Sequence, residues 1–309
     1  MKNPNLPSDI CRLTSILMIQ PISFGFNEET ASNNYFQQKK NIDDAQSKAL
    51  DEFNAFVDVL RAHQIDVTVI QDTPEPQTPD SIFPNNWISF HEGGKIVLYP
   101  MFAKNRRKER KQSVIDLVSK KFNIHDQVDL THFENVGRYM EGTGSMVLDR
   151  NNKVAYACIS ERTDPEILNA FCNEFGYTPL LFNATDRNGK LIYHTNVMMC
   201  MADNYVVVCM DSVKNETEKK ALKDSFLKTH KEIVEIDFDQ MDHFCGNMLQ
   251  VNNIGGEKFL VMSSQAYDHL SQHQIKTLNA FNPIIHSPID TIETLGGGSA
   301  RCMMAEVFQ

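Results

Sequence analysis

Residues 145–160 read SMVLDRNNKVAYACIS, and this stretch decides the fold. Two apolar runs rich in strand-forming residues flank the turn DRNN at 149–152. Two such runs around a turn of Asn and Asp residues are typical of a β-hairpin. A helix is predicted next, over about 164–175, and the short apolar run PLLF at 179–182 follows it as a third strand.

The same unit of hairpin, helix and strand recurs along the chain. Each further copy again places two β-rich runs around a Gly, Asn or Asp turn, with a helical segment behind them. Two of the helices begin with clear capping residues, Asp164 before Pro165 and Asn215 before Thr217-Glu218. The other hairpins are predicted at Trp87–Pro100, Asn196–Val213 and Asn247–Ser264, with helices at about 106–122, 216–229 and 266–280 and a late strand at Pro283–Ile285.

A fifth copy is divided between the two ends of the chain. Residues Cys302–Phe308 supply strands at the C-terminal end. Ser15–Ile19, a helix at about 42–63 and Val67–Ile70 supply the rest at the N-terminal end. Because the first and last parts complete one unit, the array is expected to close on itself. The prediction is one domain over residues 1–309, built as a ring of five ββαβ units.

The residues that open the five hairpins recur at a nearly constant separation. They are Asn86, Glu141, His194, Gly246 and Cys302, with steps of 55, 53, 52 and 56 residues. A period in this range indicates an array of like units. In a closed ring these openings converge on the axis, so a carboxylate, a histidine and a cysteine are expected to meet there.

Those three residues suit one kind of chemistry. A cysteine thiolate is a nucleophile, and a histidine can protonate a leaving amine and then activate water. Carboxylates match a planar group with many N–H donors, above all a guanidinium. Cys302 and His194 are therefore the predicted nucleophile and acid/base, Glu141 is a catalytic carboxylate, and Asp80 is a second carboxylate of the site.

Composition excludes several other functions. The 309 residues carry a net charge of -10, which argues against a nucleic-acid or anionic-membrane partner. No apolar run approaches the length of a membrane span. Seven cysteines without a C-x-x-C pair fit reduced thiols in the cytoplasm better than disulfides or zinc. The basic run KNRRKERK at 104–111 is interpreted as a solvated helix face.

Four motifs, in the right order, resemble the guanidino-group-modifying enzyme superfamily. GGGSARCM at 296–303 is similar to the nucleophile loop of arginine deiminases, and MEG at 140–142 to the family's guanidinium-binding Glu-Gly. His194 falls on the catalytic histidine, and ISERTD at 159–164 resembles a segment whose arginine, here Arg162, binds the substrate α-carboxylate. The resemblance runs from Ile16 to Phe308. It implies a five-bladed, pseudo-symmetric α/β propeller, a covalent Cys302 intermediate, and no metal or organic cofactor.

One departure from the family bears on the substrate. The arginine-directed relatives have a second Asp where this chain has Asn86, in DSIFPNN at 80–86. An amide can donate to the carbonyl of a neutral ureido group, whereas a carboxylate favours a cationic guanidinium. The substitution favours citrulline over arginine, and the resemblance is closest to a bacterial citrulline-hydrolase branch. Asn86, Asp80 and Arg162 are the predicted substrate-binding residues.

Several alternatives stay open at this point. The polar segment PISFGFNEETASNN at 21–34 either covers the pocket, as in the citrulline-hydrolase branch, or is an ordinary surface loop. The enzyme can be an arginine deiminase or a dimethylarginine dimethylaminohydrolase, or an amidinotransferase in which an amine replaces water. A catalytically silent binding protein is the alternative from another class. In every case the expected partner is a small guanidino or ureido amino acid, and the oligomeric state stays undetermined.

Overall fold

The structure, a computed structural model, describes residues 13–308. It is a mixed α/β fold with five three-stranded sheets. In each sheet the central strand pairs antiparallel with one neighbour and parallel with the other. One plan is therefore used five times, as the sequence repeat predicts.

Four of the sheets are built from strands that follow one another in the sequence. The two antiparallel strands form a hairpin, and the third strand returns in parallel after a helical crossover. The strands of these sheets are β3 (Ile88–His91), β4 (Lys95–Leu98) and β5 (Asp126–Asp129); β6 (Val147–Asp149), β7 (Val154–Cys158) and β8 (Thr178–Phe182); β9 (Met199–Met201), β10 (Tyr205–Val208) and β11 (Glu232–Glu235); β12 (Leu249–Asn252), β13 (Lys258–Ser263) and β14 (Ile284–Ser287).

The fifth sheet joins the two ends of the described chain. Its order is β15-β1-β2, where β15 is Ala305–Phe308, β1 is Leu13–Gln20 and β2 is Val67–Gln71. Strand β1 pairs antiparallel with β15 and parallel with β2. This confirms the predicted completion of the first unit by the last.

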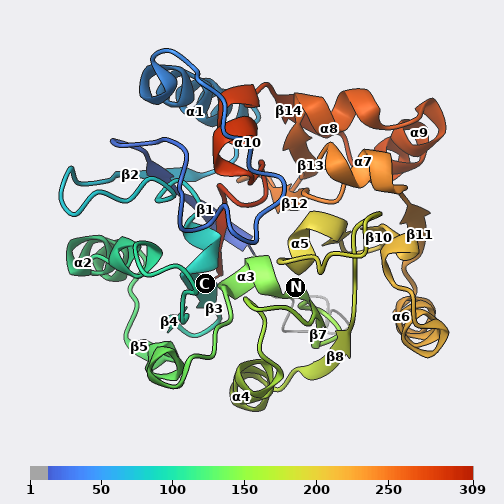
Figure 1. The fold of residues 1–309 in the computed structure, drawn as a ribbon. Helices are drawn as coiled ribbons and strands as arrows, with labels where there is room; N and C mark the ends of the chain where they lie inside the picture. The colour runs from blue at the N-terminus through green and yellow to red at the C-terminus, as the bar shows by residue number, and fades with distance from the viewer. Residues whose placement is uncertain (1–12, 309) are drawn as a thin grey trace, which may run out of the picture.

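Helices lie outside the sheets and short turns lie inside. Figure 1 shows α1, α2, α4, α6 and α9 at the periphery, with α3 and α5 near the centre. The longer helices are α1 (Ala45–Ala62), α2 (Gln112–Lys121), α4 (Pro165–Phe175), α6 (Glu216–Lys228) and α9 (Gln272–Phe281). The shorter ones are α3 (Gly142–Ser145), α5 (Thr195–Met198), α7 (Phe238–Asp242), α8 (Ser264–His269) and α10 (Asp290–Gly296), with 3-10 turns η1 (Pro84–Asn86), η2 (Arg106–Glu109), η3 (Thr131–Val136) and η4 (Met210–Ser212).

Local signals set several helix ends. The Asp164 side chain accepts from the Glu166 amide, and Asn215 accepts from the amides of Thr217 and Glu218, so both predicted caps are confirmed. The helix expected at 266–280 is instead two helices. Ser271 and Gln274 form a capping box that starts α9 afresh after α8 has ended.

Two further expectations are wrong. The helix expected at 106–122 is broken into η2 and α2, and the basic run is not a solvated face, because Arg106 and Lys111 are buried. Both side chains point inward to carboxylates, Glu109 and Asp72. Cys302 does not begin a strand: it lies in a turn after α10, and β15 starts at Ala305.

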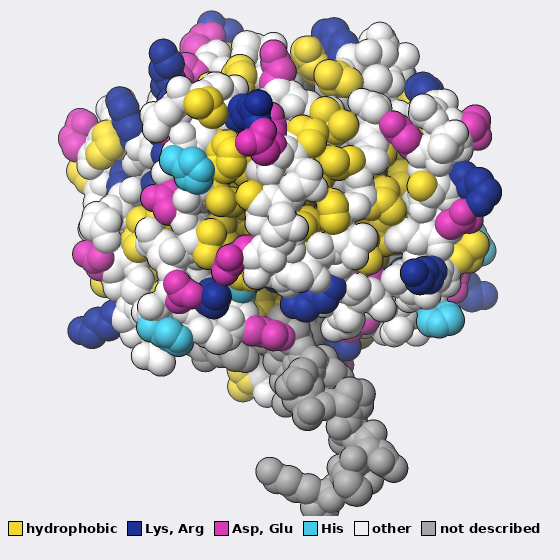
Figure 2. All heavy atoms as spheres, turned by 90° about the horizontal axis from the view of Figure 1, so that it is seen from below, with side chains coloured by type: hydrophobic (Ala, Val, Ile, Leu, Met, Phe, Trp, Pro, Cys, Tyr) yellow, Lys and Arg dark blue, Asp and Glu magenta, His cyan; other side chains and the backbone are white. Residues whose placement is uncertain are grey.

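The surface agrees with the composition. Figure 2 shows one face of the molecule, where the described Lys, Arg, Asp and Glu side chains are interspersed with hydrophobic ones and form no large area of one sign. Within residues 13–308, no helix has the length and apolar character needed to cross a bilayer.

Candidate active site

Three of the hairpin openings deliver side chains to one pocket. Asn86 ends η1, His194 precedes α5, and Cys302 lies in the turn before β15. All three line this pocket, together with Asp80 and Arg162. The fold therefore brings together five of the six predicted site residues at the pocket wall, three of them from repeat positions. The sixth, Glu141, lies directly behind His194.

Glu141 is fully buried and already holds hydrogen bonds on both oxygens. Its Oε2 lies 2.8 Å from His194 Nε2 and accepts from Arg162 Nη1 at 3.3 Å. Its Oε1 accepts from the backbone amide of Phe102 at 3.0 Å. This carboxylate is thus committed to orienting the imidazole and the guanidinium.

The charges of this cluster follow from burial and proximity. Burial alone would raise the pKa of Glu141, but Arg162 and His194 hold that pKa well below its usual range. Burial lowers the pKa of His194 to about 4, with Glu141 opposing the shift. At neutral pH, His194 is a neutral imidazole beside an ionised carboxylate.

Cys302 is 4% exposed and faces two amide donors. Asn196 Nδ2 and Asn247 Nδ2 each lie 3.3 Å from its Sγ. Asn196 follows His194 by two residues, and Asn247 follows the fourth hairpin opening, Gly246. Side chains from two other repeats therefore contact the sulfur.

Asp80 differs from Glu141 in having one oxygen without a partner. Its Oδ2 accepts from Asn27 Nδ2 at 2.7 Å and from Thr30 Oγ1 at 3.4 Å. Its Oδ1 is buried and has no hydrogen-bond partner. Burial raises the pKa of Asp80, while Arg106 opposes the shift. An unpartnered buried oxygen beside a cavity is a ready acceptor for a ligand N–H.

Arg106 is a pocket residue that sequence reasoning missed. Its Nη1 donates to Asn86 Oδ1 at 2.8 Å, and its Nε and Nη2 donate to Glu109 at 2.8 and 3.0 Å. No sequence signal separates Arg106 from its basic neighbours Arg107 and Arg110. Only the fold turns this one guanidinium inward.

The segment at 21–34 covers the pocket, so the first of its two interpretations is confirmed. Asn27 and Thr30 bind Asp80, and Asn34 Nδ2 donates to the carbonyl oxygens of Gly296 and Gly297 at 3.4 and 3.3 Å. Asn33 Oδ1 accepts from Arg162 Nε at 2.9 Å. This polar segment therefore contacts three parts of the site: Asp80, Arg162 and the glycine loop at 296–297.

Arg162 has fewer free donors than its predicted role requires. It is 1% exposed, and each of its three nitrogens already donates, to Asn33, Glu141 or the Thr30 carbonyl oxygen. It lines the pocket nonetheless. Binding of an α-carboxylate by Arg162 stays a prediction. It requires Arg162 to give up some of these hydrogen bonds and form new ones to the ligand.

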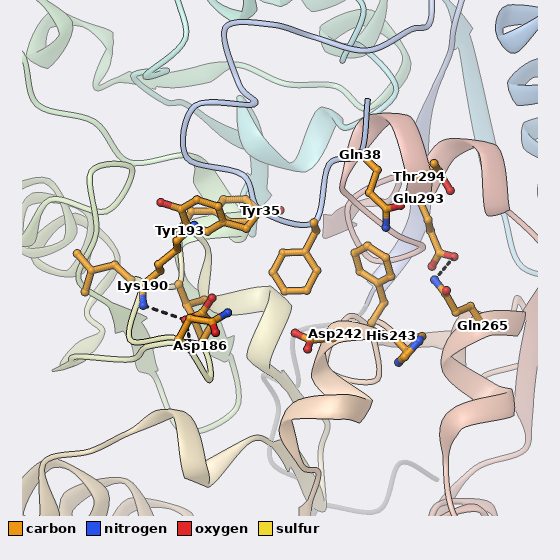
Figure 3. Close-up of a pocket in the computed structure, with 15 residues that line it drawn as sticks. Tyr35, Gln38, Asp186, Lys190, Tyr193, Asp242, His243, Gln265, Glu293 and Thr294 are labelled. Carbon is orange, nitrogen blue, oxygen red and sulfur yellow. Dashed lines mark hydrogen bonds between the residues drawn. The ribbon is translucent and has the colours of Figure 1, made fainter. Parts of the chain in front are cut away.

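Two cavities of different size meet at Tyr193. The pocket at Cys302 has a volume of about 10 Å³, room for about one water molecule. A cavity of about 320 Å³ shares Tyr193 with it. Figure 3 shows this cavity between Tyr35, Tyr193 and Lys190 on one side and Gln38, Thr294 and Glu293 on the other. The Tyr193 hydroxyl donates to the Gly297 carbonyl oxygen at 2.8 Å, which links the cavity wall to the nucleophile loop.

The fold agrees with solved structures of low sequence identity. ArgZ, an arginine dihydrolase of the ornithine–ammonia cycle in cyanobacteria, matches with a TM-score of 0.74 at 15% identity over 95% of this chain. This chain spans 40% of that ArgZ chain, and a separate structure of the ArgZ N-terminal domain is covered to 98% with a TM-score of 0.72 at 16% identity. A dimethylarginine dimethylaminohydrolase adduct with S-methyl-L-thiocitrulline gives a TM-score of 0.63 at 13% identity, covering 95% of this chain and 99% of the other.

The solved structures show the fold, and a family model shows the family to which the chain belongs. No curated protein sequence matches the chain. The family model described as "N,N dimethylarginine dimethylhydrolase, eukaryotic" matches residues 20–309. This match confirms the predicted superfamily and its enzyme class. The chain belongs to the N,N-dimethylarginine dimethylhydrolase family.

Proposed function

We propose that this protein is a cysteine-dependent hydrolase that cleaves a C–N bond in a guanidino or ureido group of an arginine-like amino acid, with citrulline favoured. One observation carries the proposal: Cys302, held by two amide donors, shares a pocket with a His194–Glu141 pair. In this proposal the five sheets are the blades of the predicted propeller. The enzyme needs no cofactor and works in the cytoplasm.

The reaction proceeds in two stages. The neutral His194 accepts the Cys302 thiol proton, and the sulfur attacks the central carbon of the ureido group. His194 then gives this proton to the departing nitrogen, which leaves as ammonia. In the second stage His194 takes a proton from water, the hydroxide attacks the S-linked carbon, and the C–S bond breaks. His194 returns the proton to the leaving Cys302 sulfur, and the released carbamic acid loses carbon dioxide to give the free amine. Glu141 orients the imidazole and stabilises its charged form.

The pocket offers complementary groups for the substrate. Asp80 Oδ1 accepts from the ureido N–H groups, since it has no partner of its own. Asn86 donates to the ureido oxygen, and Arg162 binds the α-carboxylate. Citrulline is larger than the closed pocket, so binding requires the covering segment at 21–34 to move.

Relatives support a covalent route and leave the substrate open. One structure of the ArgZ N-terminal domain is described as covalently bonded to a reaction intermediate. The related AgrE was solved with L-arginine, and the family description itself names dimethylarginine. Arginine or dimethylarginine hydrolysis is therefore the second candidate. An amidinotransferase and a silent binding protein are the remaining alternatives, and the presence of both Cys302 and His194 argues against the latter.

A substrate panel tests the proposal. Purified protein is incubated with citrulline, arginine, methylated arginines and agmatine, and both ammonia and amine release are measured. The expected result is ammonia from citrulline without any added amine. A requirement for an acceptor amine would make the enzyme a transferase, and release from arginine or its methylated forms alone would support the second candidate.

A further inference from the structure

We propose that the cavity of about 320 Å³ beside Tyr193 is a second binding site, and that its ligand is an amino acid with a cationic side chain. The site is separate from the Cys302 pocket, so its ligand is bound whichever reaction the enzyme catalyses. The cavity walls provide an unpaired buried carboxylate, four aromatic rings, and a lysine and an aspartate at the opposite end.

Glu293 is a buried carboxylate without an ionic partner. Its side chain is 2% exposed and lines the cavity. Its Oε1 accepts from Ser299 Oγ at 2.5 Å and its Oε2 from Gln265 Nε2 at 2.8 Å, and both donors are neutral. Within residues 13–308, no Lys, Arg or His side chain forms an ion pair with it.

The other buried carboxylates show how unusual this is. Within the described part of the chain, each of them lies beside a buried cation. The pairs are Asp72–Lys111, Asp80–Arg106, Glu109–Arg106, Glu141–Arg162 and Asp149–Lys231. Because a buried charge is costly unless it is paired, Glu293 is the member of this set that a cationic ligand would complete.

The protonation of Glu293 agrees with a missing cation. Burial raises its pKa to about 7 and Asp290 adds to the shift, whereas the hydrogen bonds from Ser299 and Gln265 oppose it. A bound ammonium group favours the ionised carboxylate. Binding of a cation at neutral pH should therefore release a proton from part of the protein molecules.

The rest of the cavity suits an organic cation of amino-acid size. Tyr35, Phe36, Tyr193 and Phe244 line it, with the ring centroid of Phe36 5.4 Å from that of Phe244 and 6.2 Å from that of Tyr193. Aromatic faces attract cations and cover methylene groups. The volume is at the lower end of the range for small-molecule sites. Among the described residues, no group of three His, Cys, Asp or Glu could hold a metal ion instead.

The opposite end of the cavity matches the head group of an amino acid. Figure 3 shows Lys190 and Asp186 across the cavity from Glu293. Lys190 Nζ lies 4.0 Å from the ring centroid of Tyr35 and pairs with no described carboxylate. Asp186 Oδ1 accepts from the backbone amides of Asn188 and Lys190, each at 2.8 Å, which leaves Oδ2 for a ligand. An α-carboxylate at Lys190 and an α-ammonium at Asp186 direct the side chain of the ligand toward Glu293.

Calorimetry with three amino acids tests the inference. L-ornithine and L-lysine carry a side-chain ammonium, and L-norvaline has the carbon skeleton of ornithine without it. Wild-type protein should bind both cations and should bind norvaline roughly ten- to a hundredfold more weakly, as expected for losing a charge-assisted contact. Equal affinity for ornithine and norvaline would overturn the inference, and so would the absence of ornithine binding.

Glu293→Gln and Asp242→Asn form a matched pair of variants. Glu293→Gln should lower the affinity for ornithine by roughly ten- to a hundredfold, because the amide still accepts from Ser299 but carries no charge. Asp242 lines the same cavity but is exposed and already paired with Arg187 at 2.8 Å. Its replacement should change the affinity by about fivefold at most. Thermal unfolding checks each fold, and unchanged affinity in folded Glu293→Gln would overturn the inference.

The pH dependence of binding and an active-site variant locate the ligand. Wild-type protein should bind ornithine about tenfold more tightly at pH 8 than at pH 6, because Glu293 loses its proton over this range. His243 also lines the cavity and titrates near these values, so the same dependence in Glu293→Gln would contradict the role of Glu293. Asp80→Asn, in the Cys302 pocket, should leave ornithine binding unchanged. A loss there but not in Glu293→Gln would place ornithine in the Cys302 pocket and overturn the inference.

Discussion

Two buried carboxylates lie at the candidate site, Asp80 in the pocket wall and Glu141 behind His194, and each has a buried arginine beside it, yet the two regions differ. Glu141 has hydrogen bonds on both oxygens, from His194, Arg162 and Phe102. Asp80 has hydrogen bonds on Oδ2 only, and its nearest guanidinium nitrogen is 3.7 Å away on Arg106. The pKa of Glu141 is held well below its usual range, whereas burial raises that of Asp80.

This difference separates a carboxylate whose oxygens are occupied by neighbouring side chains from one that has an oxygen free to accept from a ligand. A carboxylate with its acceptors occupied fixes the groups around it and has little left for a ligand. A buried carboxylate with an unpartnered oxygen is incomplete until a donor arrives. We therefore propose that the Glu141 region orients His194 and that the Asp80 region recognises substrate N–H groups. The predictions that follow test this division.

In the proposed reaction both carboxylate regions act on a carbon that Cys302 attacks. Cys302→Ser should reduce turnover to the level of a reaction without enzyme, because serine lacks a comparably accessible anion. Initial rates of ammonia release measure this, and thermal unfolding should show an intact fold. Mass spectrometry after alkylation should find Cys302 modified before Cys172 or Cys209, since burial raises the pKa of both to about 11. A near wild-type rate for Cys302→Ser would show that Cys302 is not the nucleophile.

The Glu141 region predicts a loss of rate when its imidazole is removed. His194→Ala should lower kcat by roughly 10²–10⁴, the range for positioned acid/base catalysis. Substrate affinity should change far less, because His194 takes up and releases protons in this proposal. Steady-state kinetics separates the two quantities. A mutant with unchanged kcat and a raised KM would show that His194 binds the substrate. The Glu141 and Asp80 regions would then both serve binding.

Glu141→Gln and Asp80→Asn compare the two carboxylates directly. Each should cost about ten- to a hundredfold in kcat/KM, the value of a charge-assisted hydrogen bond of about 1.5–3 kcal/mol. The loss in Glu141→Gln should appear in kcat. In Asp80→Asn it should appear in KM, because Asn27 and Thr30 retain the amide oxygen and turn its NH₂ toward the substrate N–H groups. The same split between kcat and KM in both variants would contradict the assignment.

Asn86 sharpens the comparison on the Asp80 side. Asn86→Asp adds a carboxylate, which favours a cationic guanidinium. With citrulline, the carboxylate would lie opposite the ureido oxygen, and two acceptors cannot form a hydrogen bond. The ratio of kcat/KM for citrulline over arginine should fall about ten- to a hundredfold. Kinetics with both substrates on both proteins gives this ratio. If it does not move, or if the wild type already prefers arginine, the argument from the amide fails, while the roles of Cys302 and His194 are untouched.

The smallest expected effect is on the pH profile. Burial lowers the pKa of His194 from 6.5 to about 4, so the base that accepts the Cys302 proton stays neutral down to that pH. The rate should therefore fall only as the pH drops through about 4, and it should be maintained at pH 5–6. The pKa of Asp80 is shifted upward, so Asp80→Asn is the control. An acid limb near 6.5, or one that disappears in Asp80→Asn, would exclude His194 as its source.

The parts of the fold that repeat could be predicted from the sequence. The steps between Asn86, Glu141, His194, Gly246 and Cys302 reflect residues that open equivalent hairpins, so periodicity alone locates most of the site. The caps Asp164 and Asn215 were also predictable, because a side-chain oxygen that accepts from nearby amides is a local interaction.

The rest depends on contacts that no local pattern encodes. Arg106 lies in a run of basic residues and is distinguished from Arg107 only by burial against Glu109 and Asn86. The covering segment binds Asp80, Arg162 and Gly297 across separations of tens to hundreds of residues. Glu141 was predicted to hold the substrate group, and only its neighbours in space show that its oxygens are occupied.

The sheet that joins β15 to β1 has a consequence for how the protein is made. Strand β1 is synthesised early, and its partner on one side, β15, follows only after the other four sheets have been translated. Until then one edge of β1 presents unpaired backbone groups, the kind of edge on which nascent chains associate. A chaperone that protects this edge should raise the yield of active protein. A chain that is cut just before the turn at 299–304 would leave β1 exposed and also lack Cys302, so an incomplete product would be inactive as well as prone to aggregation.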